Sequence, residues 1–322
     1  MKMRKILLGF AAGAAALALA ACSDGGGGES DGDEGGVEHL KVAVYGSTEE
    51  SVIDIAEREG WFAEAGIEVE KVIIGAPPAV VAAAQSGEVD IALVPSVLVV
   101  RGIAEGVPLT IVGAVDGYPA ENPEDYDSGP LLTSPDSGIT SVGDLEGATI
   151  AVSARGSMFE VKITNLLLQS GVDPESINWV TMDFATSLPA LEDGTIDAAP
   201  MISPMSEDAI KRGMVVLGYP GAAFFPEVPV DLWVASPDVI EKRGDAIRAF
   251  RDATYRAAQW ANEHEDEVKE LGVEIGQVDV DPQELKPMHF ITEVDVDALE
   301  RLNERMIEMG FLENRAEFVV LD

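Results

Sequence analysis

The chain is poor in the residue types that build disulfide frameworks and zinc sites. Among its 322 residues there is a single cysteine, Cys22, so no disulfide can form within the chain. The three histidines are scattered along the sequence, and no group of cysteine and histidine has the spacing of a zinc site. The sequence therefore predicts neither a metal site nor a cofactor.

Positive charge is also scarce, with 21 Lys and Arg against 58 Asp and Glu, which gives a formal net charge of −37. Binding to phosphate requires clustered Lys and Arg, so this balance excludes nucleic acid as a partner and disfavours broad contact with an anionic membrane surface. A charge of this size favours solubility, including in a salty habitat where ions screen the self-repulsion. The apolar share of 47% is enough for the cores of two domains.

The first 22 residues predict export and attachment to lipid. Lys2, Arg4 and Lys5 precede an apolar run over 6–21, which is short for a membrane span and usual for a secretory signal peptide. The run ends in Leu-Ala-Ala-Cys at 19–22, which resembles the lipobox of bacterial lipoproteins. This resemblance implies that Cys22 is lipidated and becomes the mature N-terminus. The alternative is an ordinary signal peptide with an incidental cysteine.

A tether is expected over 23–36, where seven of the residues are glycine and all the others are Ser, Asp or Glu. Such a segment has no apolar surface to bury and spans on average about 20 Å as a coil. We therefore expect the folded body to lie close to the outer face of the membrane, or in a periplasm.

From Leu40 onward, short apolar runs alternate with amphipathic stretches, which predicts an α/β fold of mostly parallel strands joined by helices. Strands are expected over 40–45, 67–74, 90–94, 109–115, 149–153, 177–182, 196–201, 214–218 and 230–235. Helices are expected over 47–65, 77–86, 96–105, 157–170, 188–192, 236–263 and 295–309, with a further helix starting at 203.

The two halves of this pattern repeat one another. The phrase from Gly87 through Asp90 to Ser96 matches the phrase from Gly194 through Asp197 to Ser203, which favours two related lobes over chance similarity of α/β sequences. The two aspartates are expected to serve the fold. Proline-containing segments at 116–129 and 219–229 are expected to cross between the lobes. This predicts one lobe from 37–118 with 228–322, and a second lobe with the crossovers over 119–227.

Five phrases in order carry a family resemblance: EGWFAEAGIEV at 59–69, GEVDIA at 87–92, DLEG at 144–147 followed by IAV at 150–152, GS at 156–157, and LEDGTIDA at 191–198. The sequence resembles the type II periplasmic binding proteins, in the branch that binds nitrate, sulfonate, taurine and pyrimidine precursors. The resemblance implies two lobes joined by two crossovers, a small-molecule ligand held between them, ABC permease and ATPase subunits as partners, and a monomer.

Ligands of open α/β sheets bind beyond the carboxyl ends of the strands, where helix N-termini offer free N–H groups. This favours an oxyanion such as a sulfonate, taurine or nitrate, with Arg155 as a bidentate partner. Trp233 is a candidate stacking surface. The residues expected at the ligand are Gly46, Ser47, Thr48, Ala76, Ser96, Arg155, Gly156, Ser157, Ser203 and Trp233.

The same residues also admit a purely structural interpretation. Ser47 with Glu50, and Ser157 with Glu160, have the spacing of capping boxes, and Arg155 can pair with Glu160. The alternative ligand is a pyrimidine or another heteroaromatic vitamin precursor. The alternative classes of protein are an enzyme of pyrimidine synthesis, for which no catalytic group of residues is evident, and a surface lipoprotein that transports nothing.

Replacing the lipobox cysteine tests the interpretation of the first 22 residues. We expect Cys22→Ala to abolish incorporation of labelled fatty acid and to move the protein from the membrane fraction to the soluble fraction. Cell fractionation with labelled palmitate measures both. A variant that stays in the membrane fraction would show that the apolar run is an uncleaved anchor.

Overall fold

The computed structural model describes residues 37–322, apart from 75–76, 204, 225–227 and 278. The predicted signal peptide, lipobox and tether lie outside these described residues. Strands and helices alternate along the chain, so the predicted α/β class is confirmed. None of the described helices is long and apolar enough to cross a membrane.

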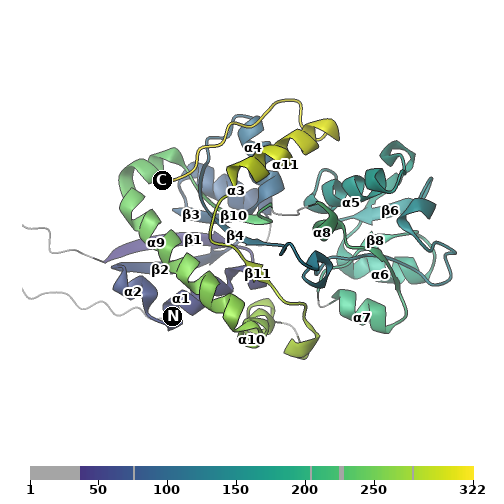
Figure 1. Cartoon of the computed structure of the whole chain (residues 1–322), viewed down its shortest axis with the longest axis horizontal. Coiled ribbons are helices and arrows are strands. Elements are labelled where there is room, and N and C mark those ends of the chain that lie inside the picture. The colour runs from purple at the N-terminus through teal and green to yellow at the C-terminus, as the bar shows by residue number, and fades with distance from the viewer. Residues whose placement is uncertain (1–36, 75–76, 204, 225–227, 278) are drawn as a thin grey trace, which may run out of the picture. The chain divides into compact units, whose positions relative to one another are not determined.

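We call the largest sheet, with the helices packed on it, the first lobe (Figure 1). The order of its six strands is β11 (His289–Phe290), β4 (Thr110–Gly117), β10 (Asp231–Ala235), β3 (Ile91–Pro95), β1 (Glu38–Val44) and β2 (Ile67–Ile73). β1 pairs in parallel with both β2 and β3, whereas β10 is antiparallel to both β3 and β4. The sheet is therefore mixed, because β10 runs in the opposite direction to its two neighbours, and its first residue lies beside the end of β4.

Apolar side chains alternate between the two faces of this sheet, as a strand buried on both sides requires. In β1, Leu40, Val42 and Val44 belong to one core and Ala43 to the other. The first core is covered by α1 (Ser51–Arg58), α2 (Trp61–Glu64) and α9 (Pro237–Glu263), and the second by α3 (Pro77–Ser86), α4 (Ser96–Ala104) and α11 (Val296–Glu308).

The helix expected over 47–65 is broken into three pieces. A short 3-10 helix, η1 (Thr48–Glu50), precedes α1, and Gly60 separates α1 from α2 with a φ of 77° that favours glycine. η1 contacts α10 (Glu265–Gly276), which follows α9 and was not expected as a separate helix. Glycine at position 272 makes this contact possible, because a Cβ there would lie 2.6 Å from Thr48 Oγ1.

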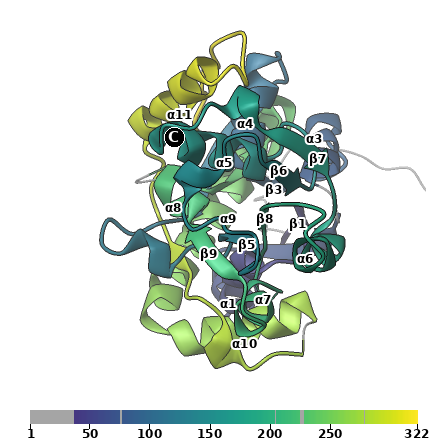
Figure 2. The same cartoon turned by 90° about the vertical axis from the view of Figure 1, so that its right-hand side faces the viewer.

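The second lobe consists of the two smaller sheets and their helices (Figure 2). One sheet has the order β8 (Ala199–Pro200), β5 (Leu131–Thr133) and β9 (Val215–Gly218), and the other pairs β6 (Thr149–Val152) in parallel with β7 (Asn178–Thr181). A bridge between Ile150 and Ala198 connects them. The helices of this lobe are α5 (Met158–Gln169), α6 (Phe184–Glu192) and α7 (Met205–Lys211).

The repeated sequence phrase corresponds to a repeated hydrogen bond. Asp90 Oδ2 accepts a 2.8 Å hydrogen bond from the amide of Lys41 in β1. Asp197 Oδ2 accepts a 2.7 Å hydrogen bond from the amide of Thr149 in β6. Each aspartate therefore ties the entry of one strand to the backbone of a neighbouring strand, which agrees with the expected structural role.

The two segments that connect the lobes are bonded to each other through the buried carboxylate of Asp127. It accepts hydrogen bonds from the amide of Gly129, at 2.9 Å, and from the amides of Gly221 and Ala222, at 2.7 and 3.0 Å. The last two residues lie in α8 (Pro220–Phe224) of the return segment. A Cβ at Gly221 would lie 2.2 Å from Tyr118 Oη, so only glycine fits there.

Removal of the Asp197 carboxylate tests its structural role. We expect Asp197→Ala to lower the free energy of unfolding by about 1–3 kcal/mol, because the amide of Thr149 loses its partner. The exposed Asp193, four residues earlier, is the control, and Asp193→Ala should change stability by less than about 0.5 kcal/mol. Urea unfolding of both variants measures the difference, and equal effects would contradict the assigned role.

Candidate functional site

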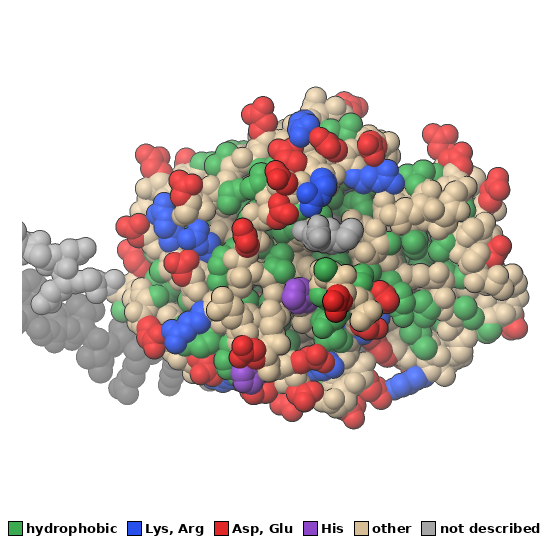
Figure 3. Space-filling view, in the orientation of Figure 1, with side chains coloured by type: hydrophobic (Ala, Val, Ile, Leu, Met, Phe, Trp, Pro, Cys, Tyr) green, Lys and Arg blue, Asp and Glu red, His purple; other side chains and the backbone are tan. Residues whose placement is uncertain are grey.

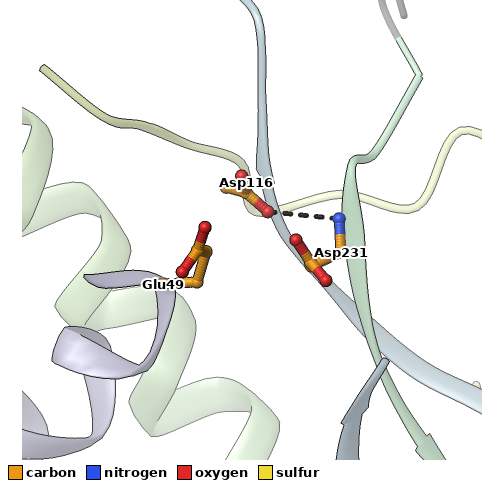
Figure 4. A group of neighbouring side chains, drawn as sticks. All are labelled: Glu49, Asp116 and Asp231. Atoms are coloured by element: carbon orange, nitrogen blue, oxygen red, sulfur yellow. Dashed lines mark hydrogen bonds between the residues drawn. The ribbon is translucent and has the colours of Figure 1, made fainter. Parts of the chain in front are cut away.

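Three carboxylates from distant parts of the sequence converge at the strand ends of the first lobe (Figure 4). Glu49 lies in η1 after β1, Asp116 lies near the end of β4, and Asp231 begins β10. One carboxylate oxygen from each of the three residues lies within 4.8 Å of the other two. Asp116 and Asp231 are buried, with 6% and 2% of their surface exposed. We call these three residues the carboxylate group.

Few hydrogen-bond donors serve these oxygens. Asp116 Oδ1 accepts a 3.1 Å hydrogen bond from the amide of Asp231, and Asp231 Oδ1 accepts one of 2.5 Å from the hydroxyl of Tyr45. Glu49 Oε2 is shielded from solvent and has no hydrogen-bond partner within the described part of the chain. The buried hydroxyl of Ser96, at the end of β3, has none there either. Buried polar atoms without a hydrogen-bond partner are uncommon in folded proteins. Their presence here favours a polar ligand at this place.

Burial and mutual repulsion shift the protonation of this group. Burial raises the pKa of Asp116 well above its usual range, and the charges of Asp231 and Glu49 raise it further. Burial, with the charge of Glu49, raises the pKa of Asp231 to about 7. Burial and Asp231 also raise the pKa of Tyr45, so its hydroxyl remains a hydrogen-bond donor. Near neutral pH the carboxylate group therefore holds a proton that a positively charged group can replace.

The chemistry of the carboxylate group suits a cation or a hydrogen-bond donor. Carboxylate oxygens are ligands for hard metal ions and acceptors for ammonium, amidine and amino groups. Tyr45 and the amide of Asp231 already occupy one oxygen on each aspartate. The remaining oxygens match the few directed hydrogen bonds of an amino group better than the six to eight ligands of a calcium ion.

Two of the turns that were expected to bind an oxyanion are occupied by carboxylates of the protein itself. The amide of Gly46 donates a 3.1 Å hydrogen bond to Glu50 Oε2, and the amide of Gly156 donates to Glu160 Oε2. Both glutamates are buried. Ser47 makes no side-chain cap, so the first expected capping box is absent, whereas Ser157 accepts a 3.4 Å hydrogen bond from the amide of Glu160.

Arg155 is also paired within the protein. Its guanidinium lies 2.9 Å from Glu160 Oε1, and 58% of its side chain is exposed. This matches the structural alternative for Arg155 rather than a position inside a ligand site. A different arginine contacts the same turn from the first lobe, because Arg101 Nη2 donates a 2.7 Å hydrogen bond to the carbonyl of Gly156.

The remaining expected ligand residues lie in different surroundings. Trp233 is corrected to a core residue: it is 1% exposed, its ring lies edge-on to Phe250 at 5.2 Å, and the pattern of β10 turns it toward α9. Thr48 packs beside α10. The hydroxyl of Ser203 is buried and has no hydrogen-bond partner among the described residues, and Ala76 lies outside them.

Sequence reasoning missed the carboxylate group, although a signal was present. Asp116 and Asp231 each adjoin an apolar strand sequence, after Val115 and Val230, where a charge is costly without a partner. It also missed His289, which β11 places opposite Gly117 and edge-on to Tyr126 at 6.1 Å. Burial lowers the pKa of His289, so it is neutral at neutral pH.

The arrangement of the described residues is that of the periplasmic binding proteins. The periplasmic aliphatic sulphonate binding protein SsuA from Escherichia coli superposes with a TM-score of 0.71, over 87% of this chain and 90% of that one, at 17% sequence identity. The model of the NMT1/THI5-like family matches residues 48–268, which is more than half of the chain. The chain therefore belongs to the NMT1/THI5-like family.

Two relatives with assigned names point to different ligands. A putative aliphatic sulfonates-binding protein of Bacillus subtilis (strain 168) is 24% identical over 269 residues, covering 81% of this chain and 76% of that protein. The 4-amino-5-hydroxymethyl-2-methylpyrimidine phosphate synthase of Schizosaccharomyces pombe (strain 972 / ATCC 24843) is 25% identical over 220 residues, covering 64% of this chain and 60% of that protein.

Neutralising Asp231 tests the protonation of the carboxylate group. The pKa of Asp231 is about 7 in the folded protein and about 4 in an unfolded chain. The folded protein therefore loses stability as pH rises from about 4 to 7, because the buried carboxyl resists ionisation. We expect Asp231→Asn to gain stability relative to the unsubstituted protein across this window, with no further change above it. Unfolding at constant ionic strength from pH 4 to 8.5 measures this, and parallel profiles would contradict the shifted pKa.

Proposed function

We propose that this chain is an extracytoplasmic, lipid-anchored solute-binding protein that captures a small molecule between its lobes and delivers it to an ABC importer. The predicted export signal and tether support the location, and the family and fold support the binding role. The expected partners are the permease and ATPase subunits of the importer, and the expected state is a monomer.

We infer further that the ligand presents an amino-substituted, positively charged or proton-donating heteroaromatic end to the first lobe. The observation that carries this inference is the carboxylate group of Glu49, Asp116 and Asp231, with oxygens within 4.8 Å of one another. A positive group at this point would stabilise charges that otherwise repel one another in a buried environment. The heteroaromatic alternative is thereby favoured over the oxyanion that the sequence pattern placed first.

An oxyanion at the same place would add a further negative charge. Two unit charges 4 Å apart interact by about 4 kcal/mol at the effective dielectric constant of a protein surface, and here the interaction would be repulsive. Two of the turns whose N–H groups could compensate, at Gly46 and Gly156, already donate to Glu50 and Glu160. A sulfonate is the second candidate ligand, because the Bacillus relative is named as a putative aliphatic sulfonates-binding protein.

An enzyme is the rival of a different class, because the Schizosaccharomyces relative is named as a synthase. The sole cysteine, Cys22, belongs to the expected lipobox rather than to the folded body. His289 is neutral and near Asp116 in the sheet, but its ring contacts Tyr126. We therefore propose that the carboxylate group binds a ligand and catalyses no reaction.

A panel of small molecules tests the ligand class. Thermal unfolding of residues 37–322 would be measured with sulfonates, taurine, nitrate, carboxylates, betaines, flavins and aminopyrimidines including 4-amino-5-hydroxymethyl-2-methylpyrimidine. A ligand at 100 times its dissociation constant stabilises by about 2.7 kcal/mol, which gives a readable shift. We expect shifts from the aminopyrimidines and none from nitrate or simple sulfonates.

Two substitutions assign the result to a site. For an aminopyrimidine, Glu49→Gln should weaken binding at least about tenfold, because a desolvated charge-assisted hydrogen bond becomes a neutral one. Glu57→Gln, on the exposed side of α1, is the matched control. Arg155→Ala should leave the affinity unchanged. If a sulfonate binds instead, loss of its binding in Arg155→Ala, with binding intact in Glu49→Gln, would place an oxyanion site at the second lobe.

A further inference from the structure

Residues 281–290 form a segment that is fixed to the first lobe at both ends, which we call the strap. At its start, η5 (Pro282–Glu284) packs on α10, and Gln283 Nε2 donates a 3.0 Å hydrogen bond to Asp266 Oδ1 of that helix. At its end, β11 pairs with β4, and its backbone exchanges hydrogen bonds of 2.8 and 2.9 Å with the side chain of Asn262 in α9. Between these two attachments, side chains of the strap reach both crossovers and the second lobe.

Lys286, in the middle of the strap, contacts both crossovers. Its Nζ donates a 2.6 Å hydrogen bond to the carbonyl of Glu124 in the first crossover. The same nitrogen lies 4.0 Å from the centre of the Tyr219 ring in the return crossover, which is the geometry of a cation–π contact. The strap therefore connects the crossovers to each other at a second place, in addition to the hydrogen bonds of Asp127.

Glu284 extends from the strap to the second lobe itself. Its Oε1 lies 2.6 Å from Nζ of Lys211, the last residue of α7. Figures 1 and 2 both place α7 and α10 at the same edge of the molecule. The two side chains are 42% and 58% exposed, and an ion pair so exposed contributes little by itself. This contact can therefore form and break without disturbing the fold of either lobe.

Acidic residues outnumber basic residues in each lobe, so the two lobes repel each other. Basic side chains are found where the lobes meet. Arg101 and Arg305 of the first lobe donate to uncharged oxygens of the second lobe, at 2.7 and 2.9 Å. Lys211 instead meets a carboxylate, so its contact depends on the charges of both partners and can be reversed by exchanging them.

We propose that the strap acts as a latch between the lobes, with Lys286 seated on the crossovers and the ion pair of Glu284 with Lys211 holding the second lobe against the first. Opening of the lobes breaks this ion pair, whereas the strap keeps its bonds to α10, β4 and α9. The latch itself does not depend on the identity of the ligand. Its effect on ligand exchange rests on the proposed function, since it controls access to the same site.

The first test needs no ligand. Residues 37–322 form one compact unit without cysteine, so spin labels can be attached at Asp208→Cys in α7 and Glu274→Cys in α10, both of which are exposed. Pulsed electron paramagnetic resonance measures the distances between the labels. We expect Lys211→Gln and Lys286→Met to add longer distances. For Lys211→Gln the ratio of separated to joined lobes should rise by up to about fivefold, the range of an exposed ion pair.

Reversal of the charges separates the ion pair from other effects of substitution. Lys211→Glu should lengthen the distances more than Lys211→Gln, and adding Glu284→Lys should restore the original distribution. Arg256→Gln is the matched control, because Arg256 pairs with Glu64 at 2.7 Å on the surface of the first lobe alone, and it should change nothing. A distribution that Lys211→Glu leaves unchanged, or that the charge exchange does not restore, would overturn the latch.

The second test uses 4-amino-5-hydroxymethyl-2-methylpyrimidine as the probe and measures its dissociation rate by stopped flow. Lys211→Glu should release the probe several times faster than the unsubstituted protein, because the lobes separate more readily, and the charge exchange should restore the slower rate. Equal rates in all variants would overturn the role of the latch in ligand exchange. Failure of every variant to bind would contradict the proposed ligand class alone, and the label distances would still decide whether the strap is a latch.

Discussion

The reversed direction of β10 is the constraint on which the rest of the site depends. A strand that enters the sheet antiparallel between β3 and β4 brings its first residue beside the last residues of β4. Asp231 is thereby placed against Asp116, and η1 adds Glu49 from the end of β1. In an entirely parallel sheet, the start of β10 would lie at the opposite edge, and the carboxylates would not meet.

In each lobe, one of the turns expected to bind an anion is satisfied by a carboxylate of the protein itself, which weakens the case for an anion at that turn. In each lobe a glycine amide after the first strand donates to a glutamate four residues later, Gly46 to Glu50 and Gly156 to Glu160. Acidic side chains also spread over much of the visible surface rather than gathering in one patch (Figure 3). The surface charge therefore favours solubility, whereas the buried carboxylate group is the part of the acidic residues that we propose for recognition.

The sequence predicted the periodic parts of this fold and missed the parts that depend on long-range contact. α3 over 77–86 and α9 to Glu263 follow from local signals, as do the paired roles of Asp90 and Asp197. The helix from Ser47 was expected to be continuous, because its break depends on packing against α10. The carboxylate group also lies at strand ends, but Asp116 and Asp231 meet only through a crossover that no local pattern specifies. Trp233 was misplaced because strand alternation alone does not say which face meets α9.

The hydrogen bonds between the two crossovers limit how the lobes can move relative to each other. Asp127 binds the amides of Gly221 and Ala222, so the two connecting segments form one hydrogen-bonded unit. Apart from the strap, two further contacts join the lobes away from this unit, from Arg101 to the carbonyl of Gly156 and from Arg305 to Asn165. A hinge motion about the crossovers would have to break both contacts, whereas the hydrogen bonds of Asp127 would be kept. A ligand held between the lobes would therefore stabilise the joined arrangement only through contacts with both lobes.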